Sequence, residues 1–163
     1  MILSLMLLIF QVKYVTYRRD RQDGRRGGGI VCYVRNNVPC KRVTELERPD
    51  VESMWLLYRN VSMPRCVSHV LIGTIYHPPD VKSYITTTYI TECLDKITQK
   101  HPNVGIVLTG DFNNLNDRVI LSFPLKQIVR SATRNNRILD KIYTNISELY
   151  DKPYTSRDWK IGS

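Results

Sequence analysis

Runs of apolar residues, separated by short polar segments, predict a series of strands before one helix. The segments 30–34 (IVCYV), 53–58 (SMWLLY) and 66–76 (CVSHVLIGTIY) are rich in β-branched and aromatic residues. Polar or proline-containing sequence follows each of them, and this combination predicts β-strands. The third run is almost continuously apolar toward its end, which is typical of a central strand buried on both faces.

One amphipathic helix is predicted over residues 81–100. Pro78 and Pro79 end the strand before it, and His101-Pro102 ends the helix. Between these limits apolar residues recur at steps of three and four positions, and they are Ile85, Tyr89, Ile90, Cys93, Leu94 and Ile97. This spacing places them on one face of an α-helix.

The patterned segments after this helix complete the predicted order. Strands are predicted at 104–110 (VGIVLTG) and 137–145 (RILDKIYTN), with a polar loop and a short helix near 118–123 between them. Strands, one helix and strands again predict α/β layering, with helices packed outside a sheet core. At 163 residues the chain is long enough for one domain with a buried core.

Two N-terminal segments do not follow this pattern. Residues 1–10 (MILSLMLLIF) are apolar but too short to span a bilayer. They are interpreted as a buried strand or helix end, as a degenerate signal peptide, or as a start that is foreign to the fold. Residues 17–29 are basic and then glycine-rich, which predicts a loop. The arginines of this predicted loop either contact phosphates or lie in solvent. They are Arg18, Arg19, Arg21, Arg25 and Arg26.

The charge and the cysteines narrow the class of protein. Lys and Arg outnumber Asp and Glu by 24 to 15, a net charge of +9, which favours a polyanionic partner such as nucleic acid over a merely soluble basic protein. The four cysteines are widely spaced without a C-x-x-C pair. This spacing predicts reduced thiols in a nuclear or cytoplasmic protein that is not secreted.

The segment VGIVLTGDFNN (104–114) places polar groups at the end of a buried strand. Functional side chains gather beyond strand ends, because there they can leave the core. In an extended segment Asp111 and Asn113 would point the same way, with Phe112 anchored in the core. An Asp can deprotonate a water, and an Asn amide can donate to a phosphate oxygen. The alternative is an Asx-type turn, in which both side chains serve only local backbone hydrogen bonds.

Other predicted strand ends also carry polar residues. Tyr76 ends the long strand in GTIYHPP, Thr133-Arg134 lie downstream, and Asp140 lies in LDKI. Polar residues at several strand ends exceed what turn chemistry predicts. We therefore expect these groups to meet in one crevice.

Motifs in a fixed order give a resemblance to a known superfamily. They are DRQDGRRGGGIVCYVRN, Glu52 before SMWLLY, LIGTIYHPP, IVLTGDFNN and ATRNNRILDKIYTN. Together they resemble the endonuclease/exonuclease/phosphatase superfamily, the fold of apurinic-site endonucleases and DNase I. Within it, the pattern is similar to the endonuclease domain of LINE-type (non-LTR) retrotransposons, which precedes a reverse transcriptase. The matching domain spans 14–147, after the apolar segment 1–13 and before an irregular tail, 148–163.

The resemblance implies an α+β fold and a hydrolytic function. The fold would be a four-layer α/β-β/α sandwich of the DNase I-like type, here incomplete, and the reaction would be Mg²⁺-dependent (or Mn²⁺-dependent) hydrolysis of DNA phosphodiesters. Asp111 would activate water and Asn113 would steady the phosphate. Tyr76 would approach the phosphate and Asp140 would match the carboxylate that orients a catalytic histidine. Together with the arginine-rich loop, this gives Thr133, Arg134, Arg25 and Arg26 as the candidate substrate-binding residues.

The departures from the superfamily pattern predict impaired activity. The pattern begins with an Asn-bearing strand and a metal-binding Glu, which nothing before Tyr14 supplies, and it ends in Ser-Asp-His, which does not follow Asp140. Asp111 is then the nearest metal candidate, and His69, His77 and His101 are interpreted as structural or solvated. The chain is expected to be truncated at both ends, monomeric and prone to aggregation.

The sequence is consistent with three functions. The first is an endonuclease acting on DNA, intact or degraded, without a membrane partner. The second is a basic nucleic-acid-binding remnant without catalysis. The third is another branch of the superfamily, which acts on phospholipids or inositol phosphates.

Overall fold

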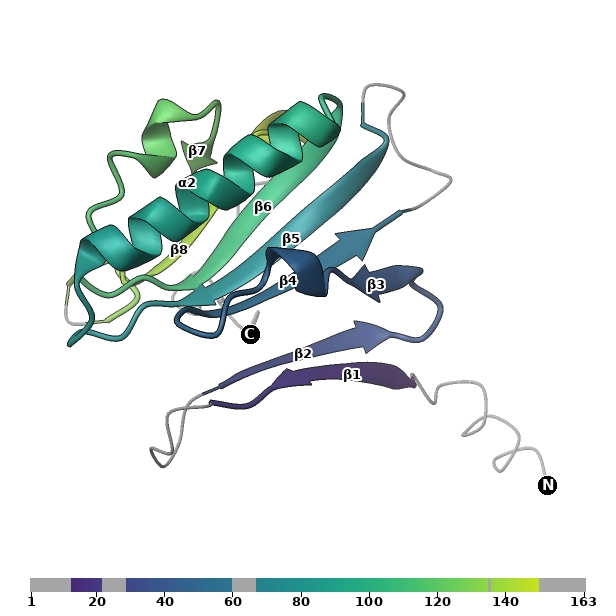
Figure 1. Cartoon of the computed structure of the whole chain (residues 1–163), viewed down its shortest axis with the longest axis horizontal. Coiled ribbons are helices and arrows are strands. Elements are labelled where there is room, and N and C mark those ends of the chain that lie inside the picture. Colours follow the sequence, from purple (N-terminus) through teal and green to yellow (C-terminus); the bar gives the residue numbers. More distant parts are fainter. Residues whose placement is uncertain (1–12, 22–28, 60–66, 135, 150–163) are drawn as a thin grey trace, which may run out of the picture.

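A mixed six-stranded sheet forms the centre of the fold in the computed structural model, which describes residues 13–21, 29–59, 67–134 and 136–149 (Figure 1). β5 and β6 are parallel, and every other neighbouring pair in this sheet is antiparallel. The strands in spatial order are β3 (Cys40–Arg42), β4 (Glu52–Tyr58), β5 (His69–Tyr76), β6 (Val104–Asp111), β8 (Asp140–Thr144) and β7 (Lys126–Gln127).

Helix α2 (Ser83–Lys100) connects β5 to β6 and covers one face of this sheet (Figure 1). Parallel neighbours need such a crossover connection. The predicted apolar face of the helix is confirmed, and all of its members except the partly buried Ile85 are buried. They pack on sheet residues that include Trp55, Leu71 and Leu108. Gly73 leaves room for the Trp55 ring, since a Cβ there would lie 2.7 Å from it.

A two-stranded sheet lies on the other face, opposite α2 (Figure 1). It consists of β1 (Tyr14–Arg19) and β2 (Ile30–Arg35), which pair antiparallel. Ile30 packs there against Met54 and Leu56 of β4. The described residues thus form three layers: helix, six-stranded sheet and two-stranded sheet. The expected fourth layer stays a prediction.

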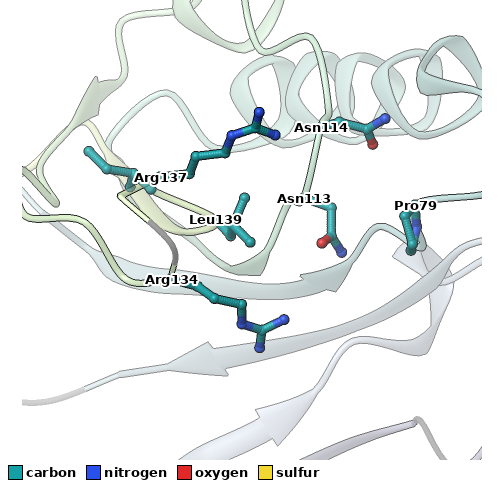
Figure 2. Close-up of a pocket in the computed structure, with 7 residues that line it drawn as sticks. Pro79, Asn113, Asn114, Arg134, Arg137 and Leu139 are labelled. Atoms are coloured by element: carbon teal, nitrogen blue, oxygen red, sulfur yellow. The ribbon is translucent and has the colours of Figure 1, made fainter.

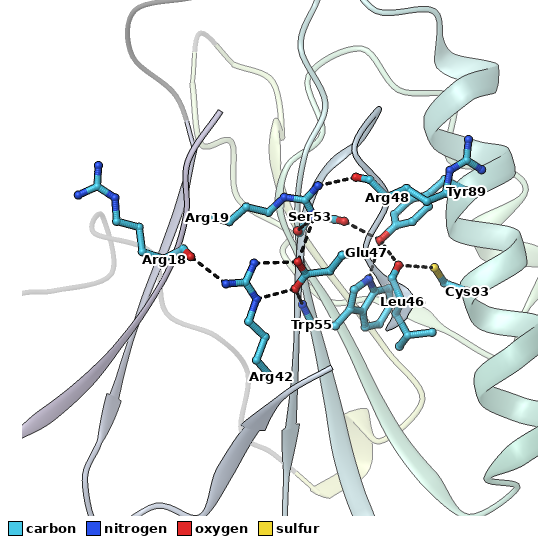
Figure 3. Close-up of polar contacts among 10 residues, drawn as sticks. All are labelled: Arg18, Arg19, Arg42, Leu46, Glu47, Arg48, Ser53, Trp55, Tyr89 and Cys93. Carbon is cyan, nitrogen blue, oxygen red and sulfur yellow. Dashed lines mark hydrogen bonds and ion pairs between the residues drawn. The ribbon is translucent and has the colours of Figure 1, made fainter. Parts of the chain in front are cut away.

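A half-buried ion network joins the two sheets (Figure 3). Glu47 accepts from Nε and Nη2 of Arg42 at 2.9 and 2.8 Å and from Nη1 of Arg19 at 3.2 Å. Arg19 also donates to the carbonyl oxygens of Ser53 and Arg48. The side chains of Arg19 and Glu47 are only 11% and 9% exposed. The network therefore fixes β1 to the segment between β3 and β4.

Tyr89 of α2 lies at the centre of a group of buried hydrogen bonds under the helix. Tyr89 Oη accepts from Trp55 Nε1 at 2.7 Å and donates to the Leu46 carbonyl at 2.8 Å (Figure 3). Burial raises the pKa of Tyr89 above its usual value, so the phenol stays protonated. Burial also raises the pKa of Cys93 to about 11. Cys32, Cys40 and Cys93 are free thiols, as expected, and Cys66 lies outside the described residues.

Several predicted boundaries require correction. Residues 17–19 belong to β1 and not to the loop predicted at 17–29, because their outward side chains are polar and obscure the alternation of the strand. The strand predicted at 137–145 begins only at Asp140, since Arg134 and Arg137 close a turn before it. The short helix near 118–123 is present as the 3₁₀ turn η2 (Ile120–Ser122). Two further 3₁₀ turns within the described residues are η1 (Thr44–Leu46) and η3 (Ser147–Leu149).

Some expectations fall on undescribed parts of the chain. The segment 1–10 and the arginines Arg25 and Arg26 lie outside the described residues. Within the described part of the chain, none of the helices has the length and hydrophobicity needed to span a membrane.

Candidate functional site at the strand ends

Four neighbouring strands place polar residues in one row at an edge of the sheet. The registers pair Glu52 with Tyr76, Tyr76 with Asp111, and Asp111 with Asp140. Residues paired in this way have their Cβ atoms about 5 Å apart in antiparallel neighbours. The structure therefore brings together three of the predicted site residues, Tyr76, Asp111 and Asp140.

Gly110 allows the chain to reach this position. It has φ +143°, and a Cβ here would lie 1.8 Å from the Ile75 carbonyl oxygen. Only glycine permits β6 to run so close to β5 immediately before Asp111. The glycine in GDFNN thus places Asp111 beside Tyr76.

The segment after β6 forms an Asx turn, one of the two interpretations of GDFNN. Asp111 Oδ1 accepts from the Asn113 backbone N–H at 3.0 Å, and Asn113 has φ +42°. The expectation that Asp111 and Asn113 share the direction of an extended segment is therefore wrong, because Asn113 is in the left-handed region. Phe112 is fully buried, as predicted.

Asn113 also connects the turn to the loop after β5. Its Nδ2 donates to the His77 carbonyl at 2.8 Å, while the His77 N–H donates to the Asp111 carbonyl at 2.9 Å. One amide N–H and the side-chain oxygen of Asn113 are not used by these bonds. Asp111 Oδ2 likewise has no hydrogen bond within the described part of the chain. Both side chains therefore keep groups that can bind a ligand.

The three histidines each contact a neighbouring side chain, and their interpretation as structural or solvated stays a prediction. His77 is fully buried, and its Nδ1 lies 2.9 Å from Thr86 Oγ1 of α2. Burial lowers the pKa of His77, although Asp111 and Asp80 oppose this shift, so the ring is neutral at pH 7. The rings of His69 and His101 pack edge to face with centroids 4.8 Å apart, near the start of β5.

The Thr133 side chain binds the backbone at the start of β8, where Asp140 lies. Its Oγ1 accepts from the N–H groups of Leu139 and Asp140 at 3.0 and 3.1 Å. Arg134 and Arg137 close the adjoining turn through paired backbone hydrogen bonds. Thr133 thereby positions Asp140, and both side chains are exposed.

A cleft of about 740 Å³ lies beside the row (Figure 2). Arg137 extends toward Asn114 above the opening, and Arg134 extends below Asn113 (Figure 2). Tyr76, Asp111 and Asp140 do not line this cleft, so the predicted groups are distributed between the row and the cleft. The lining residues are Pro79, Asn113, Asn114, Arg134, Arg137, Ile138 and Leu139.

Sequence reasoning missed Arg137, Asn114 and the partner of Glu52. The spacing in TRNNR carried the signal for Arg137, since Arg134 and Arg137 are two cations only three positions apart. Glu52 binds Arg21 Nη2 at 2.8 Å, and the Arg21 guanidinium carbon lies 6.0 Å from the centroid of the Tyr76 ring. No sequence pattern indicated this long-range pair.

Asp117 anchors the loop that follows the turn. Its Oδ2 accepts from Lys141 Nζ and from Tyr143 Oη, both at 2.7 Å. Burial alone would raise the pKa of Asp117, but these two hydrogen bonds outweigh it and lower the pKa below its usual value. The carboxylate form thus stabilises the folded state.

This contact predicts a pH-dependent stability. A depressed pKa contributes stability above the unfolded-state value of about 3.9, and the contribution is lost as pH falls through the folded-state pKa. We expect urea unfolding to show wild type more stable than Asp117→Asn at pH 7, with the difference shrinking toward pH 3. Asp95→Asn, an exposed site on α2, is the control and should change little at either pH. A gap between Asp117→Asn and wild type that stays constant from pH 7 to pH 3 would contradict this role.

The described donors do not fit a divalent metal ion. Among residues 13–21, 29–59, 67–134 and 136–149, no three His, Cys, Asp or Glu side chains lie close enough to share one. Glu52, the third carboxylate of the row, is bound by Arg21. The expected Mg²⁺ or Mn²⁺ thus has no complete ligand set in this part of the chain.

The fold is similar to those of several solved structures. One solved structure is the endonuclease domain of TRAS1, a telomere-specific non-LTR retrotransposon, with TM-score 0.59, 11% identity, and 83% of this chain and 67% of that chain covered. A second is truncated TDP2 of Caenorhabditis elegans, with TM-score 0.57 and 11% identity, and the match covers 87% of this chain and 65% of that chain. A third is an endonuclease/exonuclease/phosphatase family protein of Bacteroides thetaiotaomicron, with TM-score 0.50 and 15% identity, and the match covers 82% of this chain and 61% of that chain.

These likenesses establish the fold alone, because the identities are low. The chain spans between 61% and 67% of the length of these three structures. Neither a protein-family model nor a curated protein matches the sequence.

Proposed function

We propose that this chain carries the site of an endonuclease-type phosphodiesterase that acts on DNA, as in the domain of LINE-type retrotransposons. The observation that carries the proposal is the row of Tyr76, Asp111 and Asp140 beside a cleft that holds two arginines. Hydrolysis of a phosphodiester needs a base for water and positive charge on the phosphate oxygens. The shared fold of a retrotransposon endonuclease domain supports the proposal.

Each group has a distinct task in the proposed site. Arg134 and Arg137 bind phosphate oxygens, since a guanidinium presents several N–H donors in one plane. Asn113 donates its second amide N–H to the same phosphate without adding charge. Asp111 Oδ2 accepts the proton of the attacking water, whose oxygen bonds to phosphorus while the bond to the leaving sugar oxygen breaks, and that oxygen takes a proton from solvent. Tyr76 directs its hydroxyl at the phosphate, and Thr133 maintains the position of Asp140.

We expect little or no turnover from this chain, because the described donors do not complete a metal site. Catalytic groups act as a unit, and the loss of one costs orders of magnitude in rate. No step of the proposed mechanism is therefore assigned to a metal ion.

The test combines plasmid nicking with DNA binding. Nicking is measured with Mg²⁺ for wild type, Asp111→Ala and Asn113→Ala, and any nicking by wild type should fall in both variants. Nicking that both variants retain in full would show that cleavage arises elsewhere.

Duplex binding tests the cleft separately. The double variant Arg134→Ala/Arg137→Ala should bind a DNA duplex more weakly, and the slope of log K against log salt should fall by about 2, since each phosphate contact contributes about 0.9. Lys96→Ala/Lys100→Ala is the control with the same change of charge, placed on the C-terminal half of α2. Equal losses in both double variants would contradict a cleft-specific contact.

A second candidate is binding of DNA without cleavage. It is favoured by the ion pair that engages Glu52 and by the incomplete ligand set of the described residues. This function predicts salt-sensitive binding that needs no Mg²⁺ and no nicking at any enzyme concentration. Nicking that depends on Asp111 would exclude it.

A further inference from the structure

The outward face of the β1–β2 hairpin combines aromatic and cationic side chains. Residues that are directly paired across two strands share a face of the sheet. The pairs Tyr14–Arg35, Thr16–Tyr33 and Arg18–Val31 alternate with pairs whose side chains face the six-stranded sheet. The inward set includes Tyr17, Cys32 and Val34, which pack around Ile30, Met54 and Leu56. The hairpin outer face thus consists of Tyr14, Thr16, Arg18, Val31, Tyr33 and Arg35.

The apolar members of this face are open to solvent. Tyr33 is 69% exposed, Tyr14 is 54% exposed and Val31 is 47% exposed. The register makes Tyr14 and Tyr33 diagonal neighbours, a separation that aromatic side chains can bridge. The face is turned away from β4 and α2, and no element within the described ranges lies over it (Figure 1). Two exposed tyrosines are therefore diagonal neighbours on the hairpin outer face.

Positive charge flanks the tyrosines. Arg35 is paired with Tyr14 in the register, and Arg18 is paired with Val31, next to Tyr33. Asp20 binds Arg18 Nε at 2.5 Å, but both side chains are about two-thirds exposed, at 68% and 67%, and such a pair contributes little. A purely apolar partner would not account for Arg18 and Arg35 on this face. A polyanion whose units have flat aromatic faces matches both features.

We propose that the hairpin outer face binds single-stranded nucleic acid. Bases stack on Tyr14 and Tyr33, and backbone phosphates pair with Arg18 and Arg35, the combination by which sheet surfaces bind single strands. Duplex DNA does not offer free base faces to such a platform. This surface is separate from the strand-end row and does not depend on the proposed hydrolysis.

The test measures anisotropy of a fluorescein-labelled oligothymidylate with the full chain. Tyr33→Leu keeps an apolar side chain but removes the aromatic face, so we expect binding to weaken about tenfold, within the range of base stacking. Tyr33→Phe keeps the ring and should bind nearly as wild type does. Tyr84→Leu is the matched control, because Tyr84 is 64% exposed on α2. Circular dichroism verifies folding of each variant.

Several results would overturn the proposal. They are unchanged binding by Tyr33→Leu, an equal loss in Tyr84→Leu, or a loss that Tyr33→Phe shares. Sedimentation that shows a dimer abolished by Tyr33→Leu would assign the face to a second copy instead. Duplex nicking and duplex binding, measured in parallel, should not change in the Tyr33 variants, so failure here is distinguishable from failure of the strand-end site.

Discussion

Replacement of Gly110 by alanine is expected to destabilise the fold by roughly 3 kcal/mol or more, at the upper end of single-substitution effects. The added Cβ would lie 1.8 Å from the Ile75 carbonyl oxygen, and that atom belongs to the neighbouring strand and cannot move alone. The residue must also adopt φ +143°, which side chains with a Cβ disfavour. Relief would require β6 to separate from β5 directly before Asp111.

Urea unfolding followed by circular dichroism measures this effect. Thr109→Ala is the control, since Thr109 adjoins Gly110 in β6 and is only partly buried. The Gly110→Ala variant should unfold at much lower urea, and any DNA cleavage that depends on Asp111 should disappear with it. A midpoint for Gly110→Ala within the range of Thr109→Ala would show that the strands accommodate a side chain there.

Replacement of Glu47 by alanine should cost about 3 kcal/mol of stability. Removing one member of a buried ion pair leaves the other charge without compensation, which typically costs 3–5 kcal/mol. Here two guanidinium groups, from Arg19 and Arg42, lose their shared carboxylate. The greater exposure of Arg42, at 27%, places the expectation at the lower end of that range.

Thermal or urea unfolding compares Glu47→Ala with Glu45→Ala. Glu45 is exposed, lies in η1 beside Glu47, and makes no hydrogen bond or ion pair within the described part of the chain. We expect the control to change the free energy of unfolding by less than about 0.5 kcal/mol. Similar losses in the two variants would indicate that the network contributes no more than a surface charge does.

Hydrophobic patterning predicted the central strands and the helix because their buried side chains are mainly apolar. β5 follows from a nearly continuous apolar run, and helix α2 buries apolar residues at steps of three and four positions, so the positions of both are evident in the sequence. β1 was missed because only one of its faces is buried, and that face includes Arg19, which is buried through Glu47 and not through apolar contact. A charged residue that is buried by a distant partner has no local signal.

The candidate site was likewise predictable only in part from the sequence. Strand-end positions predicted that Tyr76, Asp111 and Asp140 would meet, and their registers agree. The direction of the Asn113 side chain was not predictable from spacing, since it depends on a left-handed backbone and on the His77 carbonyl. The Arg21–Glu52 pair depends on tertiary packing between two sheets, which no short motif encodes. The roles of these residues in catalysis stay a proposal.

The register that aligns Glu52, Tyr76, Asp111 and Asp140 has a consequence for how the site forms. These residues come from segments far apart in the chain, and β8 is the last of the four strands to be synthesised. The β4–β5 pair alone brings together only Glu52 and Tyr76, so the full row arises only when β6 and β8 have also joined the sheet. Amide protons of its central strands should therefore exchange only through global unfolding, together with the core.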